Sequence, residues 1–155
     1  FSALVTLPAG ATEIRIVVQD ADLEICCDRQ LLSRAISKLI DNAIKFSPRG
    51  VKIVVGAATT SAGDLGILVN DDGPGVAEGK LASLSQPFAQ TDMSMRRSKE
   101  GLGLGIPLVQ AIAAAHGGTL RIDSKPGEGV RALLLMPAAR IRGAALTASR
   151  AVAAG

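Results

Sequence analysis

The sequence predicts an α/β fold, a two-layer sandwich in which a mixed, mostly antiparallel sheet carries its helices on one face. Three observations predict this class. Short segments alternate apolar and polar residues and come in pairs joined by turns. Longer segments between these pairs place apolar residues at helical spacing. The chain has 155 residues, of which 48% are hydrophobic and 2% aromatic, and this fits one domain with a single aliphatic core.

The first half of the chain predicts two hairpins and a long helix. Residues 1–12 are a lead-in, and strands at 14–18 and 23–26 are expected to pair with each other. Asp28 suits the cap of a helix from Arg29 to about Phe46, whose apolar positions form a wide stripe. Segments 51–55 and 65–69 predict the second hairpin, which runs directly into the polar turn 70–75.

The second half predicts a short helix at 78–84, an irregular segment at 85–100 and a helix beginning near Ile106. An irregular segment of that length inside a compact domain is usually a lid or binding loop, or else disordered. His116-Gly117-Gly118 ends the helix, and two strands follow, joined by a turn at 125–129. The predicted domain spans residues 1–137, and 138–155 is an Ala-rich, basic tail, helical or frayed.

Charge and composition restrict the classes of function. A net charge of +3, without a basic stripe that contains aromatics, argues against nucleic acid as a partner. No apolar run approaches the roughly 20 residues that span a bilayer, so no direct membrane contact is expected from this domain. The adjacent Cys26 and Cys27 favour free thiols in a reducing compartment.

The stretch 100–107, Glu-Gly-Leu-Gly-Leu-Gly-Ile-Pro, predicts a phosphate-binding turn. Glycines allow backbone N–H groups to approach an anion, and the N-terminus of a helix attracts negative charge. Pro107 suits the first turn of such a helix. A glycine turn alone is more often structural, and this one matches neither a P-loop nor a dinucleotide-binding fingerprint.

Four segments, taken together, resemble the sequence boxes of the GHKL ATPases in the form used by sensor histidine kinases. They are 41–47 for the N box, 71–76 for the G1 box, 87–92 for the F box and 101–105 for the G2 box. The segments 116–118 and 125–129 also match the end of that domain, so the resemblance covers roughly residues 11–137. It implies the Bergerat fold and the binding of ATP with Mg²⁺.

The resemblance also implies an activity and partners. The domain would transfer the γ-phosphate of ATP to a histidine on a separate dimerisation domain of the same kinase, which then serves a response regulator. The parent protein would be a homodimer, and this domain would be cytoplasmic or the cytosolic part of a membrane-anchored kinase. Because the chain starts at Phe1 and contains no phosphoacceptor helix, we expect it to be a fragment that binds ATP without phosphorylating itself.

Asp71 is the sharpest site prediction. Its carboxylate would accept a hydrogen bond from the adenine amine and repel the guanine oxygen, which selects ATP over GTP. Gly73 and Gly75 would let the backbone and ordered water reach the base. The alternative is that Asp71 organises its own turn.

The resemblance assigns the metal and the phosphates to further residues. Asn42 would ligate Mg²⁺ through its amide oxygen, unless it is an ordinary helical Asn. Lys45 would reach phosphates or ribose, or remain a solvated charge. Phe46 would pack against adenine or the base of the lid, or belong to the core. The phosphate turn itself comprises Gly101, Leu102, Gly103, Leu104 and Gly105.

The lid would supply positive charge. Arg96 and Arg97, with Lys99, would offset the charge of the triphosphate and hold its γ-phosphate in line, although any one of them is nearly as well explained as a solvated charge. These two arginines complete the catalytic set with Asn42 and Lys45. His116 is interpreted as a residue at a helix C-terminus rather than a phosphoacceptor.

Two positions depart from the family pattern. Lys38 stands where sensor kinases usually carry the first Asn of the N box and where other members carry a general-base Glu. Arg131 stands where many sensor kinases have Thr. Lys38 motivates the alternative of a pseudokinase or nucleotide-sensing module. A serine kinase of the anti-sigma type is disfavoured by the long lid and the N box.

Overall fold

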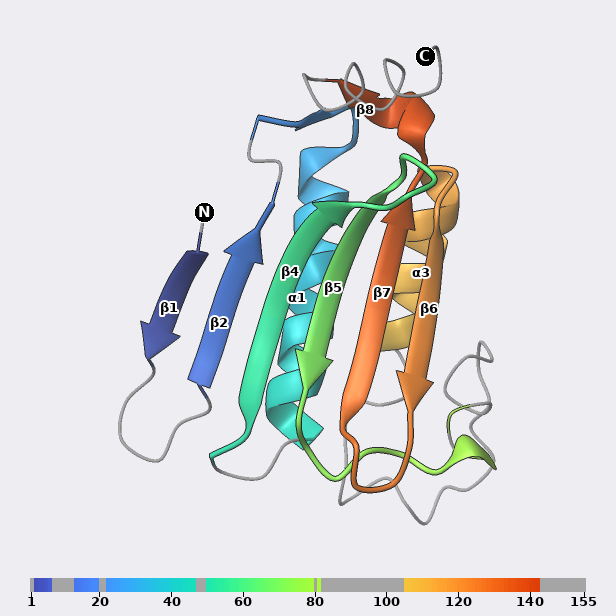
Figure 1. The fold of residues 1–155 in the computed structure, drawn as a ribbon. Coiled ribbons are helices and arrows are strands. Elements are labelled where there is room, and N and C mark those ends of the chain that lie inside the picture. Colours follow the sequence, from blue (N-terminus) through green and yellow to red (C-terminus); the bar gives the residue numbers. More distant parts are fainter. Residues whose placement is uncertain are drawn as a thin grey trace.

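The computed structural model describes residues 2–6, 13–19, 22–46, 50–79, 81 and 105–142. Figure 1 shows α1 and α3 side by side behind one face of a single large sheet. The bounds in chain order are β1 Ser2–Thr6, β2 Glu13–Val18, β3 Glu24–Ile25, α1 Arg29–Phe46, β4 Lys52–Thr59, β5 Leu65–Asp71, α3 Gly105–Ala115, β6 Thr119–Ser124, β7 Val130–Met136, a 3-10 helix Ala138–Arg140 and β8 Ile141–Arg142.

The sheet is mixed and mostly antiparallel, as predicted. Its six strands are ordered β1-β2-β4-β5-β7-β6. Only the β2–β4 pair among these is parallel, and the chain between these two strands contains α1. A parallel pair needs such a crossover, which explains why α1 packs on the sheet at this point. The two-layer fold class is therefore confirmed.

The core lies between the helices and the sheet and is aliphatic. Ala35 and Leu39 of α1 and Val109 of α3 pack with Ile53 and Leu134 from the sheet. On β5 the core residues alternate, so the side chain that follows Ile67 and Val69 at a spacing of two also faces the helices. The strand thus delivers its last residue, position 71, to the helix-covered face.

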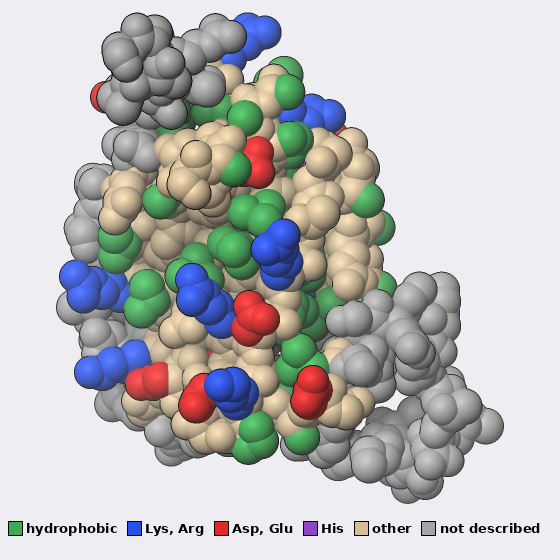
Figure 2. All heavy atoms as spheres, turned by 45° about the vertical axis from the view of Figure 1, so that its right-hand side comes forward, with side chains coloured by type: hydrophobic (Ala, Val, Ile, Leu, Met, Phe, Trp, Pro, Cys, Tyr) green, Lys and Arg blue, Asp and Glu red, His purple; other side chains and the backbone are tan. Residues whose placement is uncertain are grey.

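The opposite face of the sheet carries no helix in the described part of the chain (Figure 1). Apolar side chains gather near its middle and charged ones surround them, as Figure 2 shows. None of the helices in the described ranges combines the length and apolar character that a membrane crossing requires.

Two predictions about pairing are wrong. Segment 14–18 does not pair with 23–26, because β2 pairs with β1 and β4 while β3 pairs with β8. Residues 2–6, interpreted as part of a lead-in, form the edge strand β1. The prediction rests on the rule that segments adjacent in the sequence pair with each other. The partner of β3 is instead β8, a two-residue strand near the other end of the chain.

The packed structure also continues beyond Pro137, where the sequence suggested a tail. Ile141 is buried in the core, and β8 joins β3. The remainder of the proposed tail, 143–155, lies outside the described residues. Of the short helix predicted at 78–84, residues 78, 79 and 81 are helical and the others lie outside them as well.

The ends of both helices confirm the sequence interpretation. Asp28 caps α1, since its Oδ1 accepts the N–H of Leu31 at 3.0 Å. At the end of α3, Gly117 has a φ of +74°. Its N–H and that of Gly118 donate to the carbonyls of Ala114 and Ala113, at 2.9 and 2.8 Å, which is the Schellman arrangement.

Candidate functional site

The ends of three secondary-structure elements meet at one end of the sandwich. The last turn of α1, the first turn of α3 and the C-terminal end of β5 all lie there, and the loop after β5 runs beneath them (Figure 1). Asn42 lies about one turn before the end of α1, Gly105 begins α3, and Asp71 ends β5. The topology therefore brings the N box, the start of α3 and the G1 box to one end of the helix-covered face.

Asp71 is a buried carboxylate with 6% of its surface exposed. Burial raises the pKa of this carboxyl above its ordinary value, because the charged form loses water. Backbone N–H groups of Gly73 and Val130 oppose this rise, and the neighbouring charge of Asp72 adds to it. The Gly73 N–H donates to Asp71 Oδ1 at 3.0 Å, so the carboxylate does organise its own turn. Organising a turn through Oδ1 is compatible with accepting a ligand donor, since a carboxylate has about four acceptor positions.

The loop after Asp71 is tied to both neighbouring turns. Asp72 Oδ1 accepts the N–H of Lys52 at 2.6 Å. The N–H of Val76 donates to Ser124 Oγ at 2.8 Å, and that hydroxyl donates to the carbonyl of Gly129 at 2.6 Å. These bonds hold the G1 box against the β6–β7 turn. Ser124 was not identified from the sequence, because a single strand-end Ser carries no local signal for a contact this distant.

Gly75 is required by the space around it. Its φ is +67°, and a Cβ built there would lie 2.0 Å from the carbonyl oxygen of Lys125. Any side chain at this position would push the G1 loop away from the β6–β7 turn. Gly73, by contrast, is buried and acts here through its N–H to Asp71.

Asn42 and Gly105 face each other across the two helices. A Cβ at Gly105 would lie 3.1 Å from Asn42 Nδ2 and 3.4 Å from its Oδ1. Nδ2 is buried and has no hydrogen-bond partner among the described residues. A buried N–H donor without a partner costs free energy, so Nδ2 suits a hydrogen bond to a phosphate oxygen, whereas only Oδ1 of the same amide could ligate a metal.

The Oδ1 of Asn42 has the chemistry that Mg²⁺ requires. Mg²⁺ prefers oxygen ligands, keeps several waters and is often held by one or two protein groups together with phosphates, so one amide oxygen at this position suffices. No group of three or more His, Cys, Asp or Glu side chains that would hold a metal without phosphates occurs among the described residues.

The structure describes only some of the other predicted site residues. Lys45 is exposed in the last turn of α1, on the face of Asn42. Lys38 is half-buried one turn before Asn42. Phe46 ends α1, and its side chain lies outside the described part. The lid residues Arg96, Arg97 and Lys99 and the turn residues Gly101, Leu102, Gly103 and Leu104 also fall outside the described residues.

Comparison with known proteins decides the family. The profile described as "Histidine kinase-, DNA gyrase B-, and HSP90-like ATPase" matches residues 27–140. The chain belongs to this family. The Histidine protein kinase DivJ of Caulobacter vibrioides is 36% identical over 128 residues, which are 83% of this chain and 21% of DivJ. The chain thus spans about a fifth of this curated relative.

Solved structures place the domain among histidine kinases. The full-length ShkA structure, in complex with AMPPNP, has a TM-score of 0.69 and 28% identity, and the match covers 86% of this chain and 26% of ShkA. The mycobacterial sensor histidine kinase MprB has a TM-score of 0.66 and 27% identity over 81% of each chain. This chain is accordingly an ATP-binding domain of the histidine-kinase type within the GHKL superfamily.

Proposed function

We propose that this domain binds ATP with Mg²⁺ and transfers the γ-phosphate to a histidine on a separate dimerisation domain of its parent kinase. The supporting observation is that the buried Asp71 and the facing pair Asn42 and Gly105 lie at one end of one face. A nucleotide laid between them would have its base at the strand end and its phosphates at the helix ends.

Asp71 would read the base. Its burial removes competing water, so a hydrogen bond from the adenine amine to the carboxylate would discriminate strongly against a purine that lacks this donor. The tied G1 loop would keep the carboxylate in place before the nucleotide arrives. Gly75 would keep this loop close to the β6–β7 turn.

The helix ends would hold the phosphates. Asn42 would supply an oxygen to Mg²⁺, and backbone N–H groups in the first turn of α3 would donate to phosphate oxygens. Mg²⁺, when bound with the nucleotide, supplies neutralisation of phosphate charge. Lys45, Arg96 and Arg97 are proposed to add positive charge around the γ-phosphate.

Phosphoryl transfer depends mainly on positioning and charge stabilisation, so a domain that aligns the γ-phosphate needs little further chemistry. A histidine acceptor is itself a nucleophile. Hydrolysis would instead need a base to orient and activate water, and the ammonium of Lys38 cannot accept a proton. The half-buried Lys38, one turn from Asn42, therefore favours transfer over hydrolysis.

The proposed partners follow from this chemistry. They are the dimerisation and phosphoacceptor domain of the same kinase, within a homodimer, and a response regulator that takes the phosphate from it. We propose a cytoplasmic location, because ATP and such a regulator are available there.

The test mixes this chain with the dimerisation domain of its parent kinase and γ-labelled ATP. We expect label on the acceptor histidine only when Mg²⁺ is present, and none when that histidine is replaced by Gln. Bound ATP without transfer in either arrangement, mixed domains or full-length kinase, would contradict the proposal.

The second candidate is a pseudokinase or nucleotide-sensing module, and it rests on Lys38. A positive charge near the metal position would weaken Mg²⁺ binding. ATP affinity that is unaffected by Mg²⁺, together with absent transfer, would favour this candidate. Lys38→Asn would then raise the dependence on Mg²⁺.

A further inference from the structure

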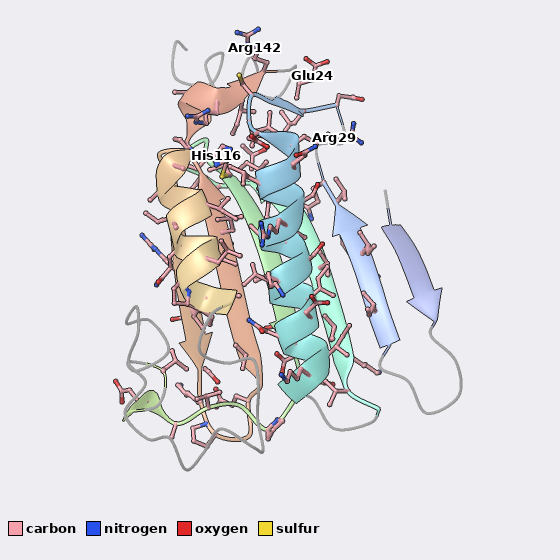
Figure 3. All side chains as sticks on the ribbon, turned by 180° about the vertical axis from the view of Figure 1, so that it is seen from behind. Glu24, Arg29, His116 and Arg142 are labelled. Atoms are coloured by element: carbon pink, nitrogen blue, oxygen red, sulfur yellow. The ribbon has the colours of Figure 1, made fainter. Side chains whose placement is uncertain are left out.

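The helices α1 and α3 run antiparallel and approach each other at both ends. At the proposed phosphate end, Asn42 faces Gly105. At the opposite end, His116, directly after α3, meets Asp28, directly before α1. Figure 3 shows His116 at this end of α3, beside the first turn of α1, where Arg29 lies. About 21 Å of helix separates Asp28 from Asn42 along α1.

The imidazole of His116 joins the two helix ends. Its Nδ1 lies 2.8 Å from the carbonyl oxygen of Ile112, and its Nε2 lies 3.0 Å from the backbone N of Asp28. A carbonyl only accepts and an N–H only donates, so Nδ1 carries the proton and Nε2 is the acceptor. The ring is buried, with 4% of the residue exposed, which makes this bond more valuable than it would be in water.

Arg140 fixes the same corner from the other side. Its Nε donates to the carbonyl of His116 at 2.5 Å, and its Nη1 donates to the carbonyl of Cys26 at 3.1 Å. The N–H of Cys26 returns a bond to the carbonyl of Arg140 at 2.7 Å. Arg140, at the end of the 3-10 helix, therefore ties the end of α3 to the residue that follows β3.

The buried contacts between the helices are aliphatic. Leu32, Ala35 and Leu39 of α1 and Val109, Ile112 and Ala113 of α3 all belong to the apolar core. The hydrophobic effect behind such contacts is non-directional, so it does not by itself select one axial register. The hydrogen bond from the Asp28 N–H to His116 is directional, and it ties the end of α3 to the start of α1.

We propose that His116 is a positioning residue for the nucleotide phosphates. It sets the axial register of α1 against α3, and thereby the placement of Asn42 opposite the first turn of α3. This inference rests on the proposed function, because it assumes that phosphates bind at that end. The base position on β5 is held by the sheet and by the G1 loop, so it does not depend on this register.

The test compares the affinity for Mg·ATP with the affinity for adenosine, both measured by calorimetry on the folded chain. His116→Asn retains a donor for the Ile112 carbonyl and removes the group that reaches Asp28. We expect Mg·ATP affinity to fall about three- to tenfold, the factor that corresponds to one net hydrogen bond. Adenosine affinity should change less than about twofold, within the scatter expected for independent sites.

His116→Gln is the rescue variant, because its longer side chain places an acceptor near the position of Nε2. It should recover most of the Mg·ATP affinity. His116→Phe keeps the volume of the ring without the acceptor, and it replaces the Asn variant if the latter does not fold. Asp28→Ser is the matched control, since it preserves the backbone N–H and a capping oxygen.

An equal loss of Mg·ATP and adenosine affinity would overturn the inference, because it would indicate general destabilisation. Unchanged Mg·ATP affinity in His116→Asn would overturn it as well. Both outcomes leave the proposed function intact. If the wild-type chain failed to bind Mg·ATP, the proposed function itself would fail, and the two failures are therefore distinguishable.

Discussion

The two halves of the site differ in how far the protein completes them by itself. At the base end, the carboxylate of Asp71 and the loop that follows it are satisfied by bonds to Gly73, Lys52 and Ser124. At the proposed phosphate end, the amide nitrogen of Asn42 is buried without a hydrogen-bond partner in the part of the chain that the structure describes. Under the proposed function, base recognition is built into the sheet, whereas the phosphate end is completed by the ligand.

The largest expected effect comes from a substitution in the loop that follows Asp71, at the proposed base end. Gly75→Ala would place a Cβ 2.0 Å from the Lys125 carbonyl on a left-handed backbone. We expect the free energy of unfolding to fall by about 3–5 kcal/mol. Urea titration followed by circular dichroism measures this, since the chain contains neither Trp nor Tyr.

Gly127→Ala is the matched control for this substitution. Gly127 has a φ of +81°, but no atom of the described residues lies within 4 Å of a Cβ built there. Gly127→Ala should therefore lower the free energy of unfolding only by the cost of a left-handed backbone, about 1–2 kcal/mol. A Gly75→Ala variant that is as mild as Gly127→Ala would show that the G1 loop is not held against the β6–β7 turn.

At the phosphate end, a substitution that harms binding should improve folding. Asn42→Leu replaces the unpaired amide by an apolar group of similar shape, so the free energy of unfolding should rise by about 1–3 kcal/mol. The gain in ATP affinity on adding Mg²⁺ should disappear. Urea unfolding and calorimetry with and without Mg²⁺ measure the two effects.

Asn42→Asp serves as the counterpart, because it restores an oxygen ligand. Its dependence on Mg²⁺ should persist while its stability falls through burial of a charge. If Asn42→Leu were instead clearly less stable than the wild type, the amide would have a structural partner and the contrast between the two halves would be lost.

The dependence of the free energy of unfolding on pH should come mainly from Asp71. Because burial raises the pKa of its carboxyl in the folded state, the folded chain binds this proton more tightly than the unfolded chain. The stabilisation is complete below the pKa of the unfolded state and is lost as pH rises through the raised pKa. At neutral pH the ionised Asp71 therefore costs stability.

Asp71→Asn should remove this cost while keeping an oxygen for the Gly73 N–H. The advantage in stability of Asp71→Asn over the wild type should be larger at neutral pH than in acid, as measured by urea unfolding across that range. An advantage that grows toward acid would have the wrong sign for a buried carboxyl.

The smallest expected effect concerns Lys38. Removing one positive charge about one helical turn from the proposed metal ligand should strengthen Mg·ATP binding by about 1 kcal/mol. Calorimetry on Lys38→Asn measures this, and Arg29→Gln at the other end of α1 is the charge-matched control. Equal changes in both variants would place Lys38 outside the phosphate region.

The sequence predicted the features that depend on neighbouring residues. The cap at Asp28, the hairpin of β4 and β5, the glycine stop after α3 and the position of Asp71 at a strand end all follow from local periodicity or turn chemistry, and the structure confirms them.

Features that depend on distant partners were not predictable in this way. The pairing of β3 with β8 joins two strands of two residues each, too short for a pattern to be recognised. The link from His116 to Asp28 depends on which helix ends meet, and no local spacing encodes this. The environment of the Asn42 amide depends on how α3 packs against α1, and no local pattern in the sequence specifies this packing.

The selectivity between ATP and GTP tests the central claim most directly. We expect the wild-type chain to bind ATP and to discriminate against GTP, and we expect Asp71→Asn to lose about 1.5–3 kcal/mol of ATP binding, the range of a charge-assisted hydrogen bond, while remaining folded. Calorimetric titration of both nucleotides into both proteins decides this. Equal affinities of the wild type for ATP and GTP, or ATP binding that is unchanged in Asp71→Asn, would contradict the assignment of Asp71 as the residue that reads the base.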